Sequence, residues 1–289
     1  MREKLMQVAK TAGKLFSARS LSRIDQKEGH ANFVTNIDRE VEEYLQQALL
    51  SLVPGSQVIG EEKENGALSD APTWIVDPVD GTTNLIHDYR CSAVSIALCE
   101  NRSPVAGLIW QPYTGEMFYA EAGRGASLNG KAIHVSETSF DRALVAFGTS
   151  PYHTGLAEKS MELALAYLHS CADIRRSGSA AVDLAYLACG RHDAFFELNL
   201  KPWDYAAGSL IVREAGGVVT MPLEPGEMRY DRSAAILASS AAIADEAAAV
   251  FARHITCPTF LTWGFNDIPI LRQNHDGPCS KSANNPLLL

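Results

Sequence analysis

Hydrophobic positions in the first part of the chain recur at helical spacing. Five of them would share one face of a helix: Leu5, Val8, Ala12, Leu15 and Phe16. This period predicts amphipathic helices over about residues 3–18 and 38–52. The short apolar run 57–59 predicts a strand that ends at Gly60-Glu61-Glu62, and the polar residues 63–73 predict a loop.

From residue 74 onward, apolar runs of strand length are separated by turn residues. Runs joined as in an antiparallel meander occur at residues 91–99, 104–111, 116–121 and 126–135. Further helices are predicted at 155–170, 179–189, 203–215 and 240–253, and further strands at 142–148, 172–176, 193–197, 217–221 and 234–238. Helices and strands mix without strict alternation and without an internal repeat, so the pattern predicts an α+β fold built in layers.

The apolar run Trp74-Ile75-Val76 ends at a carboxylate, and this junction is the most informative part of the sequence. Asp77 is followed by Asp80 and then by Gly81-Thr82-Thr83. We interpret the segment as a buried strand, a turn at Pro78 and Gly81, and a helix starting near Thr82. Hard divalent cations prefer oxygen ligands such as carboxylates, and N–H groups at a helix start bind phosphate. The pairing favours metal-assisted phosphate chemistry, whereas each Asp alone is more typical of a turn or a helix cap.

Three further acids change that balance. Glu61 follows a predicted strand, and Asp38 and Asp204 stand where helices begin, so each alone is explained as a surface residue or a cap. Together with Asp77 and Asp80, such positions can point acids into a common cleft. Several carboxylates beside a phosphate-binding helix start suit a multi-Mg²⁺ site, in which metals about 3.5–4 Å apart activate water and stabilise the leaving oxygen.

Two other motifs are rejected. Residues 125–131 spell G-x-x-x-x-G-K, but Ala132 replaces the Ser or Thr that would hold Mg²⁺, and Asn129-Gly130 predicts a hairpin turn instead. Asp77 and Asp80 are also three residues apart and not two, as in the D-x-D of phosphotransferases that use an aspartyl phosphate. That spacing disfavours a covalent Asp nucleophile.

Composition limits the classes of partner and compartment. A net charge of −9 and a pI near 5.4 disfavour nucleic-acid binding, although bound cations can supply local positive charge for a phosphorylated substrate.

The six cysteines show no C-x-x-C pair, which is typical of free thiols in a reducing compartment. Without a signal-peptide core or an apolar run near the roughly 20 residues of a membrane helix, we expect a soluble cytoplasmic protein.

The end of the chain differs from the rest. It holds several Pro and Asn and shows no clear period. We therefore divide the chain into one domain, residues 1–254, and a C-terminal extension, residues 255–289. The sequence leaves open whether the extension is poorly ordered or packs through its aromatic residues onto the body or a partner.

The motifs, in their order, resemble those of the inositol monophosphatase family. That family carries G-E-E, W-I-x-D-P-[IV]-D-G-T-T-N, and W-D-x-A-A-G followed by E-A-G-G. The matching segments are Gly60-Glu61-Glu62, Trp74 to Asn84, Trp203 to Gly208 and Glu214 to Gly217. The resemblance covers roughly residues 1–254. It implies an αβαβα sandwich, usually dimeric, that hydrolyses phosphate monoesters with Mg²⁺ and is often blocked by Li⁺.

Carried over by position, the resemblance also implies metal ligands. Glu61, Asp77 and the Val79 carbonyl would bind one Mg²⁺, and Asp77, Asp80 and Asp204 would bind a second. Glu61 would also hold a weaker third ion through water.

The remaining site residues follow in the same way. Thr82, helped by Asp38, would orient the attacking water, and the Gly81 and Thr82 N–H groups would hold the phosphate. The substrate would also contact Asp80, Ala180 and Glu197. Lys27 matches a family lysine near the site, although Asn32 stands where the family commonly has Asp.

The leading hypothesis is therefore Mg²⁺-dependent hydrolysis of myo-inositol monophosphate. Its alternative is the same chemistry on fructose 1,6-bisphosphate, histidinol phosphate, NADP or 3′-phosphoadenosine 5′-phosphate; the D-G-T-T-N ending and Glu197 favour the inositol branch. A non-enzymatic regulatory or RNA-linked protein on this fold is a further hypothesis, which the acidic charge and the full set of acids disfavour. We expect a small phosphorylated polyol or sugar as substrate, a homodimer, and no membrane or nucleic-acid partner.

Overall fold

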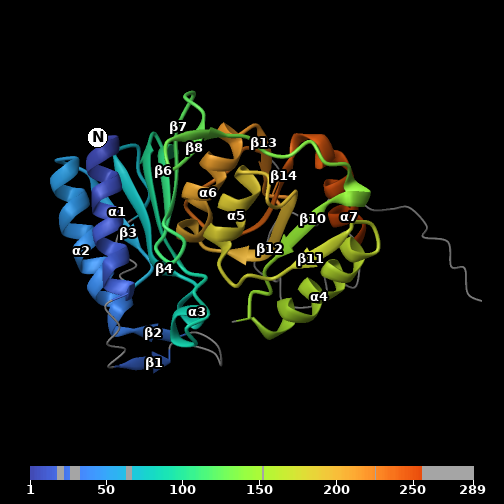
Figure 1. Ribbon diagram of the computed structural model, residues 1–289, viewed down its shortest axis with the longest axis horizontal. Coiled ribbons are helices and arrows are strands. Elements are labelled where there is room, and N and C mark those ends of the chain that lie inside the picture. Colours follow the sequence, from blue (N-terminus) through green and yellow to red (C-terminus); the bar gives the residue numbers. More distant parts are fainter. Residues whose placement is uncertain (18–22, 27–32, 63–66, 152, 225, 256–289) are drawn as a thin grey trace, which may run out of the picture.

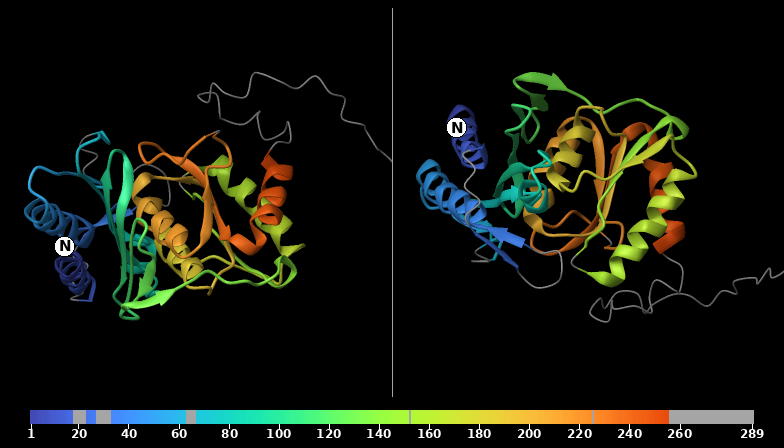
Figure 2. Two further views of the ribbon diagram at one scale, coloured as in Figure 1. Left: turned by 90° about the horizontal axis from the view of Figure 1, so that it is seen from above. Right: turned by 60° about the horizontal axis from the view of Figure 1, so that its bottom comes forward.

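The protein forms five layers in the order helices, sheet, helices, sheet, helices (Figure 1). The computed structural model describes residues 1–255 apart from 18–22, 27–32, 63–66, 152 and 225. Helices α1 (Arg2–Ser17) and α2 (Asn36–Leu52) cover the outer face of a seven-stranded sheet. Helices α5 (Ala180–Ala188) and α6 (Pro202–Glu214) lie between the sheets, and α4 (Thr154–Leu168) and α7 (Ala244–Ile255) cover the outer face of a five-stranded sheet (Figure 2). The predicted α+β class and αβαβα sandwich are confirmed.

The seven-stranded sheet has the strand order β3-β4-β5-β6-β7-β8-β9, and only its β3–β4 pair is parallel. Its strands are β3 (Gln57–Gly60), β4 (Thr73–Asp80), β5 (Ala93–Glu100), β6 (Ser103–Gln111), β7 (Glu116–Glu121), β8 (Ala126–Leu128) and β9 (Lys131–Ile133). The antiparallel run from β5 to β9 is the predicted meander, with the predicted run 126–135 divided into β8 and β9. Asn129 and Gly130 both have positive φ and connect β8 to β9 in the predicted hairpin.

The five-stranded sheet has the order β11-β10-β12-β14-β13 and is mixed. Its strands are β10 (Leu144–Phe147), β11 (Asp173–Arg175), β12 (Ala194–Leu200), β13 (Gly217–Thr220) and β14 (Ala234–Ser240). β10 is parallel to both of its neighbours, whereas β14 is antiparallel to β12 and β13. The strands β13 and β14 agree with those predicted at 217–221 and 234–238.

Strand β4 carries the site and is buried along its whole length, because helices cover both faces of its sheet. Trp74 and Val76 pack into the core beneath α1 and α2, and Ile75 packs into the core around α5 and α6. The predicted end of this strand at Asp77 is wrong, since β4 continues to Asp80. Its pairing with β5 shifts register between Asp77 and Asp80, and this irregularity accommodates Pro78, which has no N–H to donate.

The other predicted elements agree with the structure within about three residues. The helix predicted near Thr82 is α3 (Thr82–Ile86), and the last predicted helix begins with the 3-10 turn η2 (Ala241–Ile243) before α7. The ladder of β1 (Ile24–Gln26) with β2 (Phe33–Thr35) and the 3-10 turn η1 (Phe140–Arg142) were not predicted, because segments of three residues show no period.

Two expectations from composition have structural counterparts. The cysteines within the described residues, Cys91, Cys99, Cys171 and Cys189, are free thiols, as predicted. Every described helix is too short or too polar to cross a membrane. The extension, beyond Ile255, lies outside the described residues.

Candidate metal and phosphate site

The two aspartates of β4 lie at its carboxyl end and face a common space. Asp77 is buried, and its Oδ1 accepts a hydrogen bond of 2.9 Å from the Val79 N–H. Asp80 Oδ2 accepts the Ser179 hydroxyl at 2.5 Å and the Ala181 N–H at 2.6 Å. These donors belong to the N-cap and first turn of α5, so groups 99 and 101 residues later in the chain fix this carboxylate.

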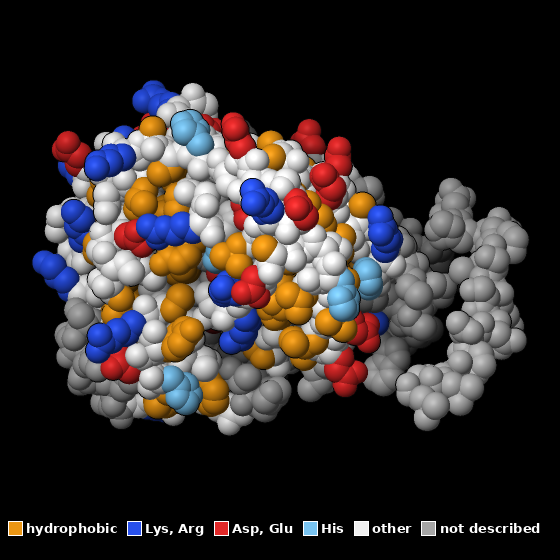
Figure 3. Space-filling model, turned by 45° about the vertical axis from the view of Figure 1, so that its right-hand side comes forward, with side chains coloured by type: hydrophobic (Ala, Val, Ile, Leu, Met, Phe, Trp, Pro, Cys, Tyr) orange, Lys and Arg blue, Asp and Glu red, His pale blue; other side chains and the backbone are white. Residues whose placement is uncertain are grey.

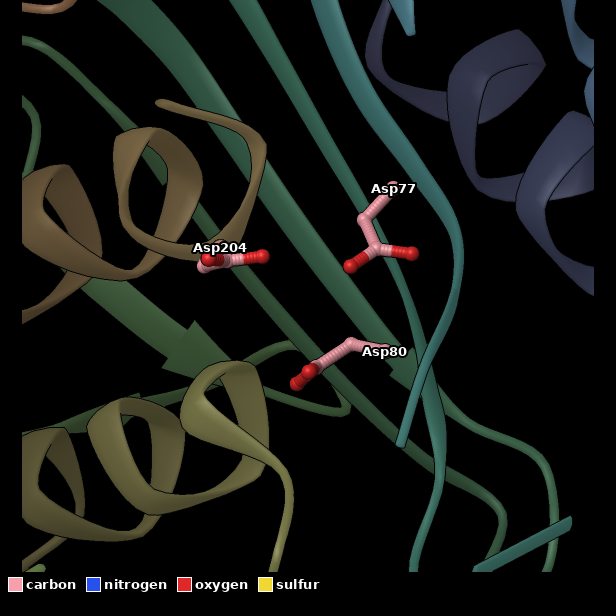
Figure 4. A group of neighbouring side chains, drawn as sticks. All are labelled: Asp77, Asp80 and Asp204. Atoms are coloured by element: carbon pink, nitrogen blue, oxygen red, sulfur yellow. The ribbon is translucent and has the colours of Figure 1, made fainter. Parts of the chain in front are cut away.

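Asp204 reaches the same space from the first turn of α6. Pro202 occupies the start of this helix, and Asp204 Oδ2 accepts the Lys201 N–H at 2.7 Å. One carboxylate oxygen from each of Asp77, Asp80 and Asp204 lies within 4.8 Å of the other two, and the three side chains converge in Figure 4. Asp204 thus caps a helix and also belongs to the cluster.

Burial and mutual repulsion oppose the ionisation of these acids. Burial, and then the charges of Glu61, Asp80 and Asp204, raise the pKa of Asp77 well above its ordinary value. Burial raises the pKa of Asp80 to about 6 against the hydrogen bonds that it accepts. Burial, and then the charges of Asp80 and Glu61, raise the pKa of Asp204. Carboxylates packed in this way ionise together only beside positive charge. An all-oxygen donor set of this kind fits Mg²⁺.

Thr82, the first residue of α3, is tied to α2. Its hydroxyl donates to Asp38 Oδ1 at 2.9 Å, with the Val79 carbonyl at 3.1 Å as a second acceptor. The other carboxylate oxygen of Asp38 accepts the Thr35 N–H at 2.8 Å and caps α2. Burial raises the pKa of Asp38. Asp38 therefore takes part in the cap of α2 through Oδ2, as the cap interpretation predicted. It contacts Thr82 through Oδ1, as the family resemblance led us to expect.

Gly81 shapes the turn between β4 and α3. Its φ of 90° is a left-handed conformation that favours glycine. A Cβ at this position would lie 3.0 Å from the Cys91 carbonyl oxygen, so the chain is also closely packed there. Gly81 and the acids line the same cavity.

A cavity of about 380 Å³ opens beside these acids. It is also lined by Ala180, at the start of α5 between the two residues that bind Asp80, and by Glu197, in β12. Burial raises the pKa of Glu197 to about 7, and its Oε1 accepts the Ser150 N–H at 2.9 Å. The predicted site residues that line the cavity are Glu61, Asp77, Val79, Asp80, Gly81, Thr82, Ala180, Glu197 and Asp204. Asp38 lies behind Thr82, and Lys27 lies outside the described residues.

Several residues that shape the cavity were not predicted. Asn84 donates its side-chain N–H groups to the Cys91 carbonyl at 2.6 Å and to the Ser177 carbonyl at 3.0 Å, which joins α3 to the segment before α5. Asp183 lines the cavity and accepts the Ser177 hydroxyl at 2.7 Å. Asn84 is the last residue of the motif Trp74 to Asn84, and Ser179 is of a type that is common at helix N-caps, so the sequence around each gave a local indication of its role. Their partners are distant in sequence and carried none.

Comparisons with known proteins agree with this geometry. A family model described as "Inositol monophosphatase family" matches residues 1–256. The chain is 40% identical to Nus factor SuhB of Vibrio cholerae serotype O1 over 219 residues, 74% of this chain and 80% of the relative. It is 39% identical to inositol monophosphatase 2 of Solanum lycopersicum over 224 residues, 74% of this chain and 83% of the relative. The solved structure of an IMPase from Thermotoga maritima superposes with a TM-score of 0.78 at 30% identity, covering 86% of this chain and 95% of that one.

Proposed function

Because the chain belongs to the inositol monophosphatase family, we propose that it hydrolyses myo-inositol monophosphate to inositol and phosphate with two or three Mg²⁺ ions. The observation that supports this most strongly is the convergence of Asp77, Asp80 and Asp204 within 4.8 Å. The cluster stands beside Gly81 and Thr82, the start of a helix, where backbone N–H groups can hold a phosphate.

The residues of the cluster divide into metal ligands and positioning groups. Glu61, Asp77 and the Val79 carbonyl would hold one ion, and Asp77, Asp80 and Asp204 a second. Bound Mg²⁺ would neutralise the phosphate and lower the pKa of the attacking water. Thr82, with its hydroxyl held by Asp38, would orient that water. Catalysis would then rest on positioning and electrostatics, with no protein nucleophile.

The side of the cavity formed by Glu197 and Ala180 would bind the leaving group. Glu197 would accept hydrogen bonds from hydroxyl groups of the polyol, and Ala180 would contact its ring. This side is also where the alternative esters, fructose 1,6-bisphosphate, histidinol phosphate, NADP and 3′-phosphoadenosine 5′-phosphate, would differ in their contacts. We further propose a cytoplasmic homodimer that is inhibited by Li⁺.

Phosphate release from inositol 1-phosphate, with and without Mg²⁺, tests the proposed reaction. We expect release that requires Mg²⁺, is inhibited by Li⁺, and is faster than release from the four alternative esters under the same conditions. Rapid turnover of one of those esters, with none of inositol 1-phosphate, would replace the substrate. No release from any of them would contradict the enzymatic function.

A regulatory role on the same fold is the second candidate, favoured by the name Nus factor that a similar relative carries. The charge of the chain does not support RNA binding, since the net charge is −9. On the face drawn in Figure 3, the described acidic and basic side chains are interspersed and do not gather into one basic area. Electrophoretic mobility of structured RNA with the purified protein measures this directly, and we expect no shift.

A further inference from the structure

Helix α2 buries two carboxylates one turn apart, Asp38 and Glu42, among apolar positions. Both side chains are nearly inaccessible, with 0% and 2% of their surface exposed. Burying a carboxylate costs free energy unless it is hydrogen-bonded, so we looked for the contacts that explain each of these two residues. Asp38 has one in its bond to Thr82, whereas Glu42 takes no part in the reaction proposed above.

Glu42 reaches across to the turn that follows β3. Its Oε2 accepts the backbone N–H of Glu62 at 3.0 Å. Its carboxylate also packs against Gly60, where an added Cβ would lie only 2.4 Å from Glu42 Oε1 and 3.0 Å from Cδ. The carboxylate of Glu42 therefore contacts the chain immediately before and immediately after Glu61.

We infer that Glu42 is a positioning residue that fixes Glu61 toward the metal site by holding the turn of residues 60–62. This inference rests on the proposed function, in which Glu61 is a metal ligand. The side chain of Glu42 accepts this backbone N–H directly, and burial restrains it from leaving the contact. Groups that orient a metal ligand typically change metal affinity or activity by about 10–100-fold when removed. On this account α2 supports the site twice, through Asp38 at Thr82 and through Glu42 at Glu61.

The test is a calorimetric titration of Mg²⁺ into the metal-free full-length chain. We expect Glu42→Ala to weaken Mg²⁺ binding about 10-fold, and Glu42→Gln, which keeps an acceptor oxygen, to restore most of it. Leu49→Ala is the matched control, because Leu49 is buried in the same helix but away from the turn. It should lower thermal stability and leave Mg²⁺ affinity unchanged, so a general loss of stability is distinguished from loss of positioning.

A second variant tests the contact from the other side. Gly60→Ala should weaken Mg²⁺ binding as Glu42→Ala does, because the new methyl group displaces the Glu42 carboxylate. In the double variant the clash is gone, so Gly60→Ala should add little to the loss caused by Glu42→Ala. Losses that simply add would overturn the inference.

The outcomes separate this inference from the proposed function. Wild-type protein that binds Mg²⁺ and releases phosphate, together with Glu42→Ala that binds Mg²⁺ equally well, would overturn the role of Glu42 alone. Wild-type protein that binds no Mg²⁺ would overturn the metal site and the inference with it.

Discussion

The two sides of the cavity are built in different ways. The metal wall, which we define as Asp77, Asp80 and Asp204, consists of acids at the end of a strand and the start of a helix. The substrate wall, which we define as Glu197 and Ala180, comes from the other sheet and from the start of α5, next to the groups that bind Asp80. Both walls stand at irregular pairing, since β4 shifts register between Asp77 and Asp80 and β12 between Glu197 and Leu200.

The difference between the walls separates chemistry from selectivity. The carboxylates of the metal wall are placed by backbone geometry and by helix N–H groups, so an exchange there removes one of three clustered oxygen donors. Glu197 is held instead by Ser150, whose N–H and hydroxyl both donate to its Oε1, and it is outside the group of three clustered aspartates. Exchanging it should alter which leaving group fits while the reaction centre remains intact.

Asp77→Asn should have the largest effect on the metal wall. We expect phosphate release to fall by more than about 100-fold, beyond the range for outer-shell partners of a metal. The free energy of unfolding of the metal-free protein should rise, because Asn replaces a carboxyl group that the folded state must either hold charged against burial and its acidic neighbours or protonate. Steady-state kinetics and chemical denaturation in EDTA measure the two effects. Asp173→Asn, at an exposed site in β11, is the control. If metal-free Asp77→Asn were less stable than the metal-free wild type, the view that Asp77 destabilises the metal-free fold would be contradicted.

Asn84→Asp should disturb the junction of the two walls. Both side-chain hydrogen bonds of Asn84 go to carbonyl oxygens, and a carboxylate in its place would face them without a proton to donate. We expect about 1–3 kcal/mol of lost stability and about 10-fold lower kcat/KM, since the start of α5 holds Asp80. Thermal denaturation and kinetics measure both. Unchanged stability and rate would show that the walls are held together by other contacts.

Glu197→Gln should act on the substrate wall alone. We expect KM for inositol 1-phosphate to change by about 10-fold, the size of one hydrogen bond to a charged group. Mg²⁺ affinity should stay as in wild type. Kinetics with the ester panel and Mg²⁺ titration give both quantities. If Glu197→Gln lost as much Mg²⁺ affinity as Asp77→Asn, the separate roles of the metal wall and the substrate wall would be contradicted.

A further effect, which needs no substitution, is the dependence of metal-free stability on pH. The folded-state pKa is about 6 for Asp80 and about 7 for Glu197, above the roughly 4 of carboxyls in unfolded chains. Between these values the folded state binds more protons, so its stability falls as pH rises from about 4 to about 7. Thermal unfolding in EDTA should give a lower Tm at pH 8 than at pH 5. Mg²⁺ should recover most of the loss, and equal Tm values in EDTA would contradict the raised pKa values.

Local patterns predicted the layers and the metal wall because both depend on neighbours in sequence. The helical period of α2, the apolar run before Asp77 and the start of α6 at Pro202 are all visible in windows of a few residues. The end of β4 was misplaced because Pro78 is a turn signal by itself, and only its pairing with β5 shows that the strand continues. Glu197 came from the family resemblance, since nothing around it in the sequence marks it.

Contacts between distant segments could not be predicted. Ser179 meets Asp80 across 99 residues, Asn84 meets Ser177 across 93, and Glu42 meets Glu62 across 20. A single Ser, Asn or Glu in an ordinary local setting carries no sign of its partner. The sequence therefore indicated which acids converge and left out most of the groups that hold them in place.

The central claim is that Asp77, Asp80 and Asp204 together bind Mg²⁺. Calorimetric titration of Mg²⁺ into metal-free wild type and Asp204→Asn tests it most directly, because it does not depend on the choice of substrate. We predict that the wild type binds two or three ions, and that Asp204→Asn, with an unchanged circular dichroism spectrum, binds at least one fewer and loses hydrolysis. Equal Mg²⁺ binding by the two proteins would contradict it.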